Sequence, residues 1–199
     1  MLNTPFRRPS AKLQGFTVVE MVVVLLILGS LMAVAVPNMA DWLRNLKVRG
    51  VAESLRTGLD KARMEALKSN RSVGYWLVQD GSSKVPGASC ELSSSGLHWV
   101  VSETSPAGKC DDSSVVLRRS EALDDQGQVT VAAVDLSGAA ANTVTFTGLG
   151  QVASAGMLRQ ITVSRADGKG RPLRVLVETG GSVRTCDPGV SSSDPRACP

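Results

Sequence analysis

The chain has 199 residues, a formal net charge of +4 and 43% hydrophobic residues. This length holds one ordinary domain and an additional element, and it is too short for two full domains of average size. Arg7, Arg8 and Lys12 precede Gly15 without any acidic residue, and without these three the net charge is only +1. The net charge is therefore weak evidence for a nucleic-acid partner. An argument for such a partner has to rest on local clusters of basic residues.

Residues 16–36 form a 21-residue stretch whose only charged side chain is Glu20. At about 1.5 Å per helical residue this stretch matches the roughly 30 Å hydrocarbon core of a bilayer. We therefore expect a transmembrane helix over 16–36, preceded by a basic leader over residues 1–15. The leader stays cytoplasmic by the positive-inside tendency, which places the chain after Pro37 outside the cytoplasm.

Two other interpretations fit the same segment. One is a removable secretory signal, because a basic start and an apolar run precede the small residues Ala33 and Ala35. Against it, Glu20 lies at the start of the apolar run and the helical pattern continues past Ala35. The other is a plain membrane anchor in which Glu20 is incidental. A carboxylate within a membrane costs on the order of 2–3 kcal/mol, so a partner for Glu20 is the better expectation.

The run Gly15-Phe16-Thr17-Val18-Val19-Glu20 resembles the processing motif of type IV prepilins and of type II secretion pseudopilins. The resemblance implies that a prepilin peptidase cleaves between Gly15 and Phe16 and then N-methylates Phe16. The resemblance also implies that Glu20 becomes the fifth residue of the mature chain and acts as an assembly residue. Its carboxylate neutralises the α-amino group of a neighbouring subunit inside an apolar helix bundle, where an unpaired charge is costly.

Residues 37–71 continue the helix as an amphipathic segment. Apolar side chains recur mostly every three or four residues, which is the spacing of a helix face that packs on a core: Met39, Trp42, Leu43, Leu46, Val51, Leu55, Leu59, Ala62 and Ala66. Pro37, Gly50 and Gly58 are candidate points of bending, and Asn70 is the expected C-terminal stop. With residues 16–36 this pattern predicts one helix of about 50 residues.

Residues 72–199 change to β-favouring runs separated by Gly, Ser, Pro and Asp clusters. We expect strands near 73–79, 97–102, 114–119, 128–134, 142–147, 158–165 and 172–179, with a further one near 182–186. Such short alternating runs predict a globular, mostly antiparallel β domain.

The run from Leu55 to Ala66, followed by Asn70, resembles the helix of the GspH/FimT group of minor pilins, and the final 60 residues resemble the C-terminal half of that group. The resemblance implies an α+β, pilin-like fold. Its long N-terminal helix has a transmembrane half and an amphipathic half, and it packs on the C-terminal β domain.

The cysteines Cys90, Cys110, Cys186 and Cys198 show no C-x-x-C spacing of a zinc or redox site. Behind a membrane or export signal they predict disulfides in an oxidising compartment. Four cysteines allow three connectivities, of which we favour the sequence-local pairs Cys90–Cys110 and Cys186–Cys198. The second pair closes a C-terminal loop.

No group of residues predicts catalysis. His98 is the only histidine, and it lies in a strand-like stretch without a nucleophile elbow or a companion metal ligand. Neither Asp111-Asp112 nor Asp124-Asp125 fits the spacing of a calcium loop. We therefore expect a protein that is not an enzyme, with no catalytic residue, no metal and no cofactor.

Basic residues gather toward the C-terminus, where seven arginines and lysines face four acidic residues after Met157. Some FimT-like minor pilins bind DNA through a G-R-x-R motif near the final disulfide loop. The run Gly181-Ser182-Val183-Arg184 resembles it, but Ser182 replaces the first arginine, which removes about one phosphate contact. The residues that this resemblance implies as DNA contacts are Arg171, Arg174, Arg184 and Arg196. The simpler interpretation is a solvated basic edge.

The expected function is that of a minor pilin or pseudopilin at or near the tip of a type IV pilus or a type II secretion pseudopilus, supporting pilus biogenesis or protein secretion. Its expected partners are other pilins through the N-terminal helix, the prepilin peptidase and the inner membrane. We expect a single-pass protein of the bacterial inner membrane with a periplasmic β domain, later assembled into the filament. The alternative is a DNA-binding minor pilin for DNA uptake.

Overall fold

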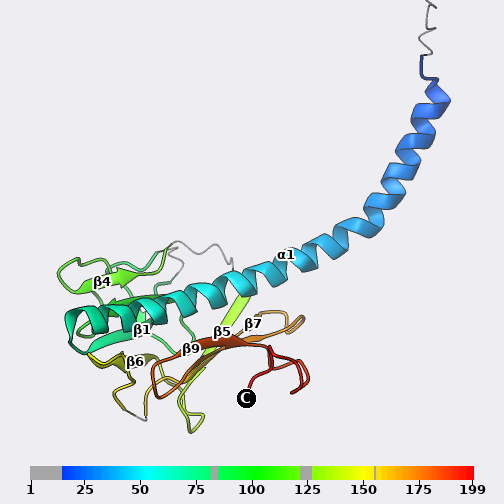
Figure 1. Cartoon of the computed structure of the whole chain (residues 1–199). Coiled ribbons are helices and arrows are strands. Elements are labelled where there is room, and N and C mark those ends of the chain that lie inside the picture. Colours follow the sequence, from blue (N-terminus) through cyan, green and yellow to red (C-terminus); the bar gives the residue numbers. More distant parts are fainter. Residues whose placement is uncertain (1–14, 82–84, 122–126, 155) are drawn as a thin grey trace, which may run out of the picture. The chain divides into compact units, whose positions relative to one another are not determined.

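The computed structural model describes residues 15–81, 85–121, 127–154 and 156–199, without the side chains of residues 34–38. The chain divides into two compact units, Met1–Asp41 and Trp42–Pro199. Helix α1 (Val18–Ser69) begins in the first unit and ends in the second (Figure 1). Its 52 residues match the single helix of about 50 residues expected from the sequence.

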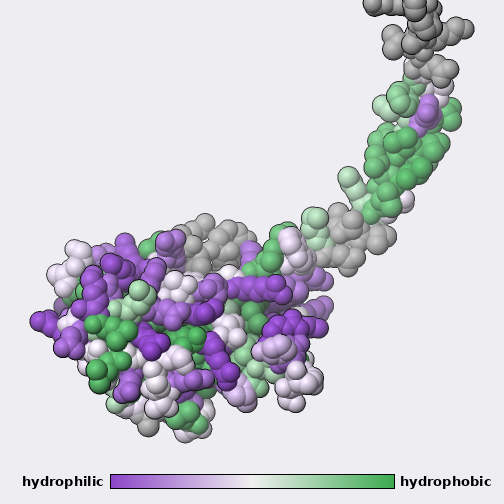
Figure 2. Space-filling model, viewed as in Figure 1, coloured by the Kyte–Doolittle hydropathy of each residue, from purple (hydrophilic) through white to green (hydrophobic). Residues whose placement is uncertain are grey.

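The surface of α1 in the first unit is apolar. Large apolar side chains are exposed at almost every position from Phe16 to Met32, and Figure 2 shows this part of the helix as a nearly continuous hydrophobic surface. Across the residues that the structure describes, no helix combines the length and the apolar character needed to cross a membrane.

The second unit contains two antiparallel sheets. The first sheet, sheet A, has the order β2-β1-β3-β4, and β6 also pairs with β1. Its strands are β1 (Val73–Gln79), β2 (Glu91–Leu92), β3 (His98–Ser102), β4 (Val116–Arg119) and β6 (Thr143–Phe146). The second sheet, sheet B, has the order β5-β7-β8-β9. Its strands are β5 (Val129–Val134), β7 (Gln160–Arg165), β8 (Leu173–Val177) and β9 (Val183–Cys186).

These strands confirm the predicted α+β class and the antiparallel β domain, because every pair of named strands in the described residues is antiparallel. Each predicted strand appears, shortened by up to a few residues. The sequence did not predict β2, because Glu91–Leu92 is too short to show an alternating pattern.

Helix α1 ends where the sequence predicted. Asn70 adopts a φ of 51°, a left-handed conformation that asparagine tolerates better than most residues. The backbone N–H of Arg71 then donates to the carbonyl of Ala66 at 3.3 Å, which closes the last turn. This stop turns the chain directly into β1, the central strand of sheet A.

The main core lies between α1 and both sheets. The helix contributes a buried stripe whose members recur at helical spacing: Val48, Val51, Ala52, Leu55, Leu59, Ala62 and Ala66. Alternate residues of the strands meet it, including Val73, Tyr75 and Leu77 of β1 and Val175 and Val177 of β8. Full burial of one such large apolar side chain stabilises the fold by about 1.5–3 kcal/mol.

The N-terminal part of the predicted stripe is not buried. Met39, Trp42, Leu43 and Leu46 are exposed, whereas burial begins at Val48. The helical spacing of apolar residues is continuous across this point, so the spacing alone did not reveal where burial begins.

Gly58 has a packing role that the sequence did not reveal. A Cβ at this position would lie 2.4 Å from the ring of Trp99 in β3, so the absence of a side chain lets the indole lie directly on the helix. The indole Nε1–H of Trp99 donates to the hydroxyl of Ser54 at 3.2 Å, and the ring lies close to that of Tyr75. The helix is continuous through Gly50 and Gly58, so neither residue interrupts it.

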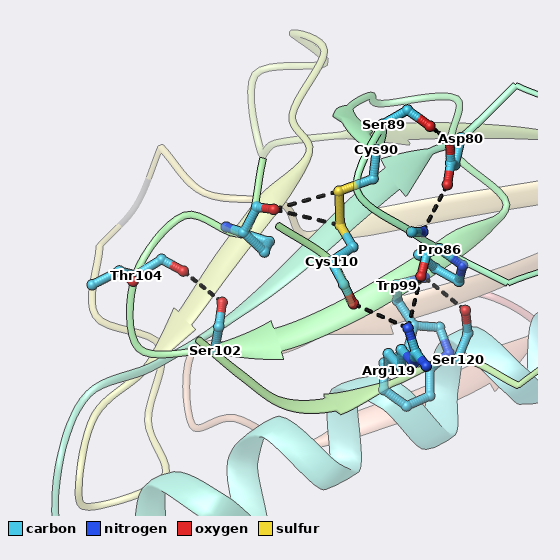
Figure 3. The surroundings of a disulfide bond; sticks show 12 residues. Asp80, Pro86, Ser89, Cys90, Trp99, Ser102, Thr104, Cys110, Arg119 and Ser120 are labelled. Carbon is cyan, nitrogen blue, oxygen red and sulfur yellow. Dashed lines mark hydrogen bonds between the residues drawn. A yellow bond between two sulfur atoms is a disulfide. The ribbon is translucent and has the colours of Figure 1, made fainter. Parts of the chain in front are cut away.

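The opposite face of sheet A carries a smaller core built around the Cys90–Cys110 disulfide (Figure 3). Arg119 of β4 donates to the carbonyls of Pro86 at 2.9 Å and Cys110 at 3.4 Å, which ties both ends of this region to the sheet. Asp80 accepts from the Gly87 N–H at 2.7 Å and from the Ser89 hydroxyl at 2.6 Å. These two hydrogen bonds lower the pKa of the Asp80 carboxyl.

The second disulfide joins Cys186, at the end of β9, to Cys198. Both sequence-local pairs favoured from the sequence are therefore present, and no described cysteine is free. Inside the closed loop the N–H of Asp187 donates to the carbonyl of Arg196 at 2.8 Å. A cross-link over 12 to 20 residues stabilises a fold by about 3 kcal/mol through the unfolded state, in the chain-entropy model.

Candidate functional site

The residues of the processing motif lie at the start of α1. Apart from its chain neighbours, no described residue has an atom within 4 Å of a Cβ placed on Gly15, and Phe16 is 79% exposed. Thr17 is the N-cap, because its hydroxyl accepts a hydrogen bond from the backbone N–H of Glu20 at 3.2 Å. The Gly15–Phe16 bond is therefore exposed on a short segment just before a capped helix.

Glu20 has a local role in addition to the expected assembly role. It lies in the first turn of α1, where a negative side chain is favoured by the partial positive charge of the helix N-terminus. Thr17 and Glu20 have the T-x-x-E spacing of a capping box, a signal that the sequence offered and that identifies Thr17 as a further residue of this site. Within the described residues, the carboxylate of Glu20 forms no ion pair.

Arg184, the residue that matches the DNA-binding motif, is half-exposed on β9 and lies 3.4 Å from the carboxylate of Glu178. The hydroxyl of Ser182 donates to the same carboxylate at 2.7 Å. Ser182, which stands where the motif has arginine, therefore helps to hold the acidic partner of Arg184. This pairing lowers the positive charge that Arg184 offers to a phosphate.

Arg196 is paired with Asp194 through two hydrogen bonds, Nε to Oδ1 at 3.0 Å and Nη2 to Oδ2 at 2.7 Å. The hydrogen bonds from Arg196 lower the pKa of the Asp194 carboxyl to about 2, and Arg171 adds a smaller electrostatic contribution in the same direction. The same pairing raises the pKa of Arg196. Arg171 and Arg196 thus both lower the pKa of the same carboxyl group, that of Asp194.

Arg174 lies on β8 opposite Cys186, and Arg184 lies opposite Leu176 on the neighbouring strand. Because register positions two residues apart point to the same side, Arg174 and Arg184 share the face of sheet B that points away from the main core. Arg184 and Arg196, in contrast, line two different cavities. The structure brings the four arginines to one part of the domain but not into one cluster.

Gly181 serves the packing of the domain. It has a φ of +81°, and a Cβ there would lie 1.8 Å from the carbonyl oxygen of Gly150. That oxygen also accepts a hydrogen bond from Nε of Arg63 in α1 at 3.1 Å. The β8–β9 turn, the Gly150 turn and the helix therefore meet here, and only glycine fits at position 181.

His98 is buried in β3, and its Nδ1 lies 3.2 Å from the hydroxyl of Ser120. The imidazole also makes a small electrostatic contribution to the lowered pKa of the Asp80 carboxyl. The Ser120 side chain is enclosed, since the residue is 1% exposed. The hydroxyl also accepts from the Trp99 N–H at 3.4 Å (Figure 3), so this group serves to join β3 to the chain after β4. Among the described residues no cluster of His, Cys, Asp or Glu is arranged to hold a metal ion.

Sequence reasoning missed Arg159. It is a buried arginine directly before β7 and lines the same cavity as Arg184. Arg159 falls within the strand predicted near 158–165, and the alternation of β7 puts it on the same face as the buried Ile161 and Val163. That period was the available signal, but a charged side chain is ordinarily read as exposed.

A long helix whose second part packs on antiparallel sheets, with a solvent-exposed apolar first part and two disulfides, defines the pilin-like class of α+β proteins. A family model described as type II transport protein GspH matches residues 51–181. The chain belongs to the GspH family, which confirms the resemblance found in the sequence. No curated protein sequence matches the chain.

Among solved structures, the chain is similar in fold to the type IV minor pilin FimU of Pseudomonas aeruginosa in two crystal forms. In space group P65 the identity is 20%, the TM-score is 0.43, and the match covers 75% of this chain and 98% of FimU. In space group P21 the identity is 18%, the TM-score is 0.45, and the match covers 79% of this chain and 98% of FimU.

Proposed function

We propose that this chain is a minor pilin or pseudopilin, a structural subunit at or near the tip of a type IV pilus or a type II secretion pseudopilus, which supports pilus biogenesis or protein secretion. Membership of the GspH family supports this role. The single observation that carries it is the exposed apolar surface of α1 between Phe16 and Met32.

An apolar surface of this extent is covered in the functional state, because water contact with so many large apolar side chains is unfavourable. In the proposed life of the protein two environments cover it in turn. Residues 16–36 first lie in the inner membrane, with the β domain in the periplasm. The same residues then pack against the helices of neighbouring subunits in the filament. Membrane insertion rests on the apolar sequence of 16–36 and its basic flank.

Processing precedes assembly in this proposal. A prepilin peptidase removes residues 1–15, and the exposure of Gly15 and Phe16 supports access to the bond between them. The new, N-methylated α-amino group of Phe16 is positively charged and meets the carboxylate of Glu20 from a neighbouring subunit. Each charge offsets the desolvation cost of the other within an apolar bundle.

The test of this function is the variant Glu20→Ala, compared with Glu53→Ala as a matched control on the exposed face of the same helix. We expect Glu20→Ala to be processed and inserted normally but to be depleted at least tenfold from sheared filaments. We expect Glu53→Ala to assemble like the wild type. Normal incorporation of Glu20→Ala would remove the charge-pairing mechanism.

Mass spectrometry of the native N-terminus tests the processing step separately. An N-methylated Phe16 is the expected terminus. A mature chain that starts just after Ala35 would instead identify a secreted β domain released by ordinary signal peptidase, and would overturn the proposed function.

DNA binding is the second candidate, and the specific observation in its favour is that Arg174 and Arg184 share one face of sheet B. Mobility shifts with the purified chain at low and high salt test it. Retardation at low salt that weakens in Arg184→Gln supports this function, since a lost phosphate contact reduces both affinity and its salt dependence. The absence of retardation at low salt contradicts it.

A further inference from the structure

The first two turns of α1 in the second unit expose apolar side chains to solvent. Trp42 is 59% exposed, Leu43 50% and Leu46 39%. With about 3.6 residues per turn these three residues share one side of the helix, and Val48, which is 1% exposed, lies on the opposite side in the core. The exposed apolar side of residues 42–49 therefore points away from the core on which α1 packs.

Basic residues border this apolar side. Residues 42–52 include three basic residues, Arg44, Lys47 and Arg49, and no acidic residue. By helical position Lys47 lies at one edge of the apolar side and Arg49 at the other. Within the described residues neither of these two forms an ion pair, and Glu53, the next acidic residue along the helix, lies 3.8 Å from Arg56 instead. Both border cations can therefore bind an anion from outside the chain.

The turn between β7 and β8 adds positive charge beside this segment. A Cβ on Gly170 would lie 2.5 Å from the side-chain oxygen of Asn45, so this turn touches α1 here. Lys169 in the turn is exposed. The acidic residue of the turn, Asp167, accepts two hydrogen bonds from the buried Arg165. The charge that the turn presents beside α1 is therefore that of a cation.

An exposed tryptophan among aliphatic side chains, bordered by cations, is typical of a helix surface that contacts lipid headgroups. An indole is favoured at the membrane–water interface, because its ring is apolar and its N–H is polar. Lysine and arginine bind the lipid phosphates while their aliphatic stems lie beside the acyl chains. A nucleic acid would use the cations but would leave Leu43 and Leu46 in water. The surface therefore fits lipid better than nucleic acid.

The position of the segment along the chain fits such a contact. Trp42 follows the apolar residues 16–36 by six residues and Arg49 follows them by thirteen, which correspond to about 9 and 20 Å of helix. The headgroups of a bilayer extend roughly 5–8 Å beyond the hydrocarbon core on each side. The whole segment reaches the headgroups where its helix runs at a slant to the bilayer, and Pro37 is a residue at which helices commonly bend.

We propose that the side of α1 formed by Trp42, Leu43, Leu46, Lys47 and Arg49 is a contact surface for anionic phospholipid headgroups. The three apolar side chains occupy the interface, and the two cations bind the lipid phosphates. This contact holds the second unit against the membrane surface before the subunit enters the filament. The inference rests on the membrane insertion of the proposed function, and it assigns a lipid contact to residues beyond 16–36.

The test uses the full chain reconstituted in vesicles of phosphatidylcholine, with or without phosphatidylglycerol. Phosphatidylcholine that is brominated near the headgroup end of its acyl chains quenches a tryptophan at the interface, and iodide quenches one exposed to water. The signal of Trp42 is obtained by difference from Trp42→Phe, since Trp99 is 2% exposed and Trp76 is partly buried. We expect the bromolipid to quench Trp42, more strongly in the anionic vesicles and less at high salt.

Charge variants test the role of the two border cations. Each lysine or arginine is favoured about fivefold near an anionic surface, so Lys47→Gln/Arg49→Gln should remove most of the difference in Trp42 quenching between anionic and neutral vesicles. Lys68→Gln/Arg71→Gln is the matched control, because both residues are exposed at or just beyond the far end of α1. This control should be quenched like the wild type.

Three results overturn the inference while the chain stays in the vesicles after an alkaline wash, and they leave the proposed function standing. Quenching of Trp42 by iodide but not by bromolipid means that water covers this surface. Protection of Trp42 from both quenchers means that protein covers it. Equal quenching by bromolipid in neutral and anionic vesicles excludes the anionic headgroup. A chain that the alkaline wash removes contradicts the membrane insertion of the proposed function, and this inference then fails with it.

Discussion

The two parts of helix α1 carry similar apolar side chains but bury them very differently. From Phe16 to Met32 almost every large apolar side chain is exposed, whereas from Val48 to Ala66 the apolar stripe is almost fully buried. The helix is continuous across both parts, so the difference does not arise from secondary structure. It arises from packing: the second part packs on the sheets of its own unit, whereas the apolar side chains of the first part are exposed.

The helical spacing of apolar residues therefore defines an apolar face of the helix, but it does not define what covers that face. The predicted stripe included Met39, Trp42, Leu43 and Leu46, which the structure leaves exposed. These four side chains are exposed, as are those of the first part. We expect them to be covered, with the residues before them, by neighbouring subunits in the filament.

The largest expected effect comes from truncating the same residue type in the two parts. Leu55→Ala leaves a cavity in the core of the second unit and should lower its free energy of unfolding by about 3 kcal/mol. Leu25→Ala should change it by less than about 0.5 kcal/mol, because Leu25 is exposed. Guanidinium unfolding in detergent, followed by near-UV circular dichroism, measures both. Similar losses in the two variants would mean that the first part also packs within the chain.

Removal of the buried disulfide should have an effect of similar size. The double variant Cys90→Ser/Cys110→Ser releases a cross-link with a sequence separation of 20 residues, and we expect a loss of about 3 kcal/mol in the unfolding of the second unit. The proposed processing at Gly15 and the proposed membrane insertion should be unchanged, since the residues proposed for both lie in the first unit. Impaired processing of this variant would contradict the independence of the two parts.

Gly181→Ala should destabilise the second unit by about 2 kcal/mol, because its φ of +81° is strained for alanine and the new Cβ would overlap the Gly150 carbonyl. Gly180→Ala is the matched control, since no atom lies within 4 Å of a Cβ there. The two thermal unfolding midpoints give the comparison. Equal midpoints would show that the turns next to Arg63 can move apart without cost.

The smallest expected effect concerns acid. The pKa of Asp194 is lowered from 3.8 to about 2, so its pairing with Arg196 stabilises the folded state above the ordinary pKa, and this contribution is lost as the pH falls through about 2. Between pH 5 and pH 2 the unfolding midpoint should therefore drop slightly less in Asp194→Asn than in the wild type. The same pH dependence in both proteins would mean that the pair does not persist in solution.

Much of this fold was predictable because its signals are local. Asn70 ended the helix where the sequence predicted, since a left-handed residue after a long apolar pattern is a local stop. The strands followed from alternation, and the two disulfides from short sequence separations. β2 was missed because two residues carry no period, and the contact of Gly58 with Trp99 was missed because it joins residues 41 positions apart.

The candidate site divides in the same way. The processing motif and Glu20 can be identified from consecutive residues, and so can the Thr17 cap. The sequence by itself therefore determined the helix, the strands and the cysteine pairs, because each depends on residues that are near one another in the chain. The processing motif stays a prediction. Only the tertiary structure decided that Arg184 meets Glu178, that Gly181 meets Gly150 and that the charged side chain of Arg159 is buried. Burial and charge pairing depend on which distant segments fold together, and no local pattern encodes that.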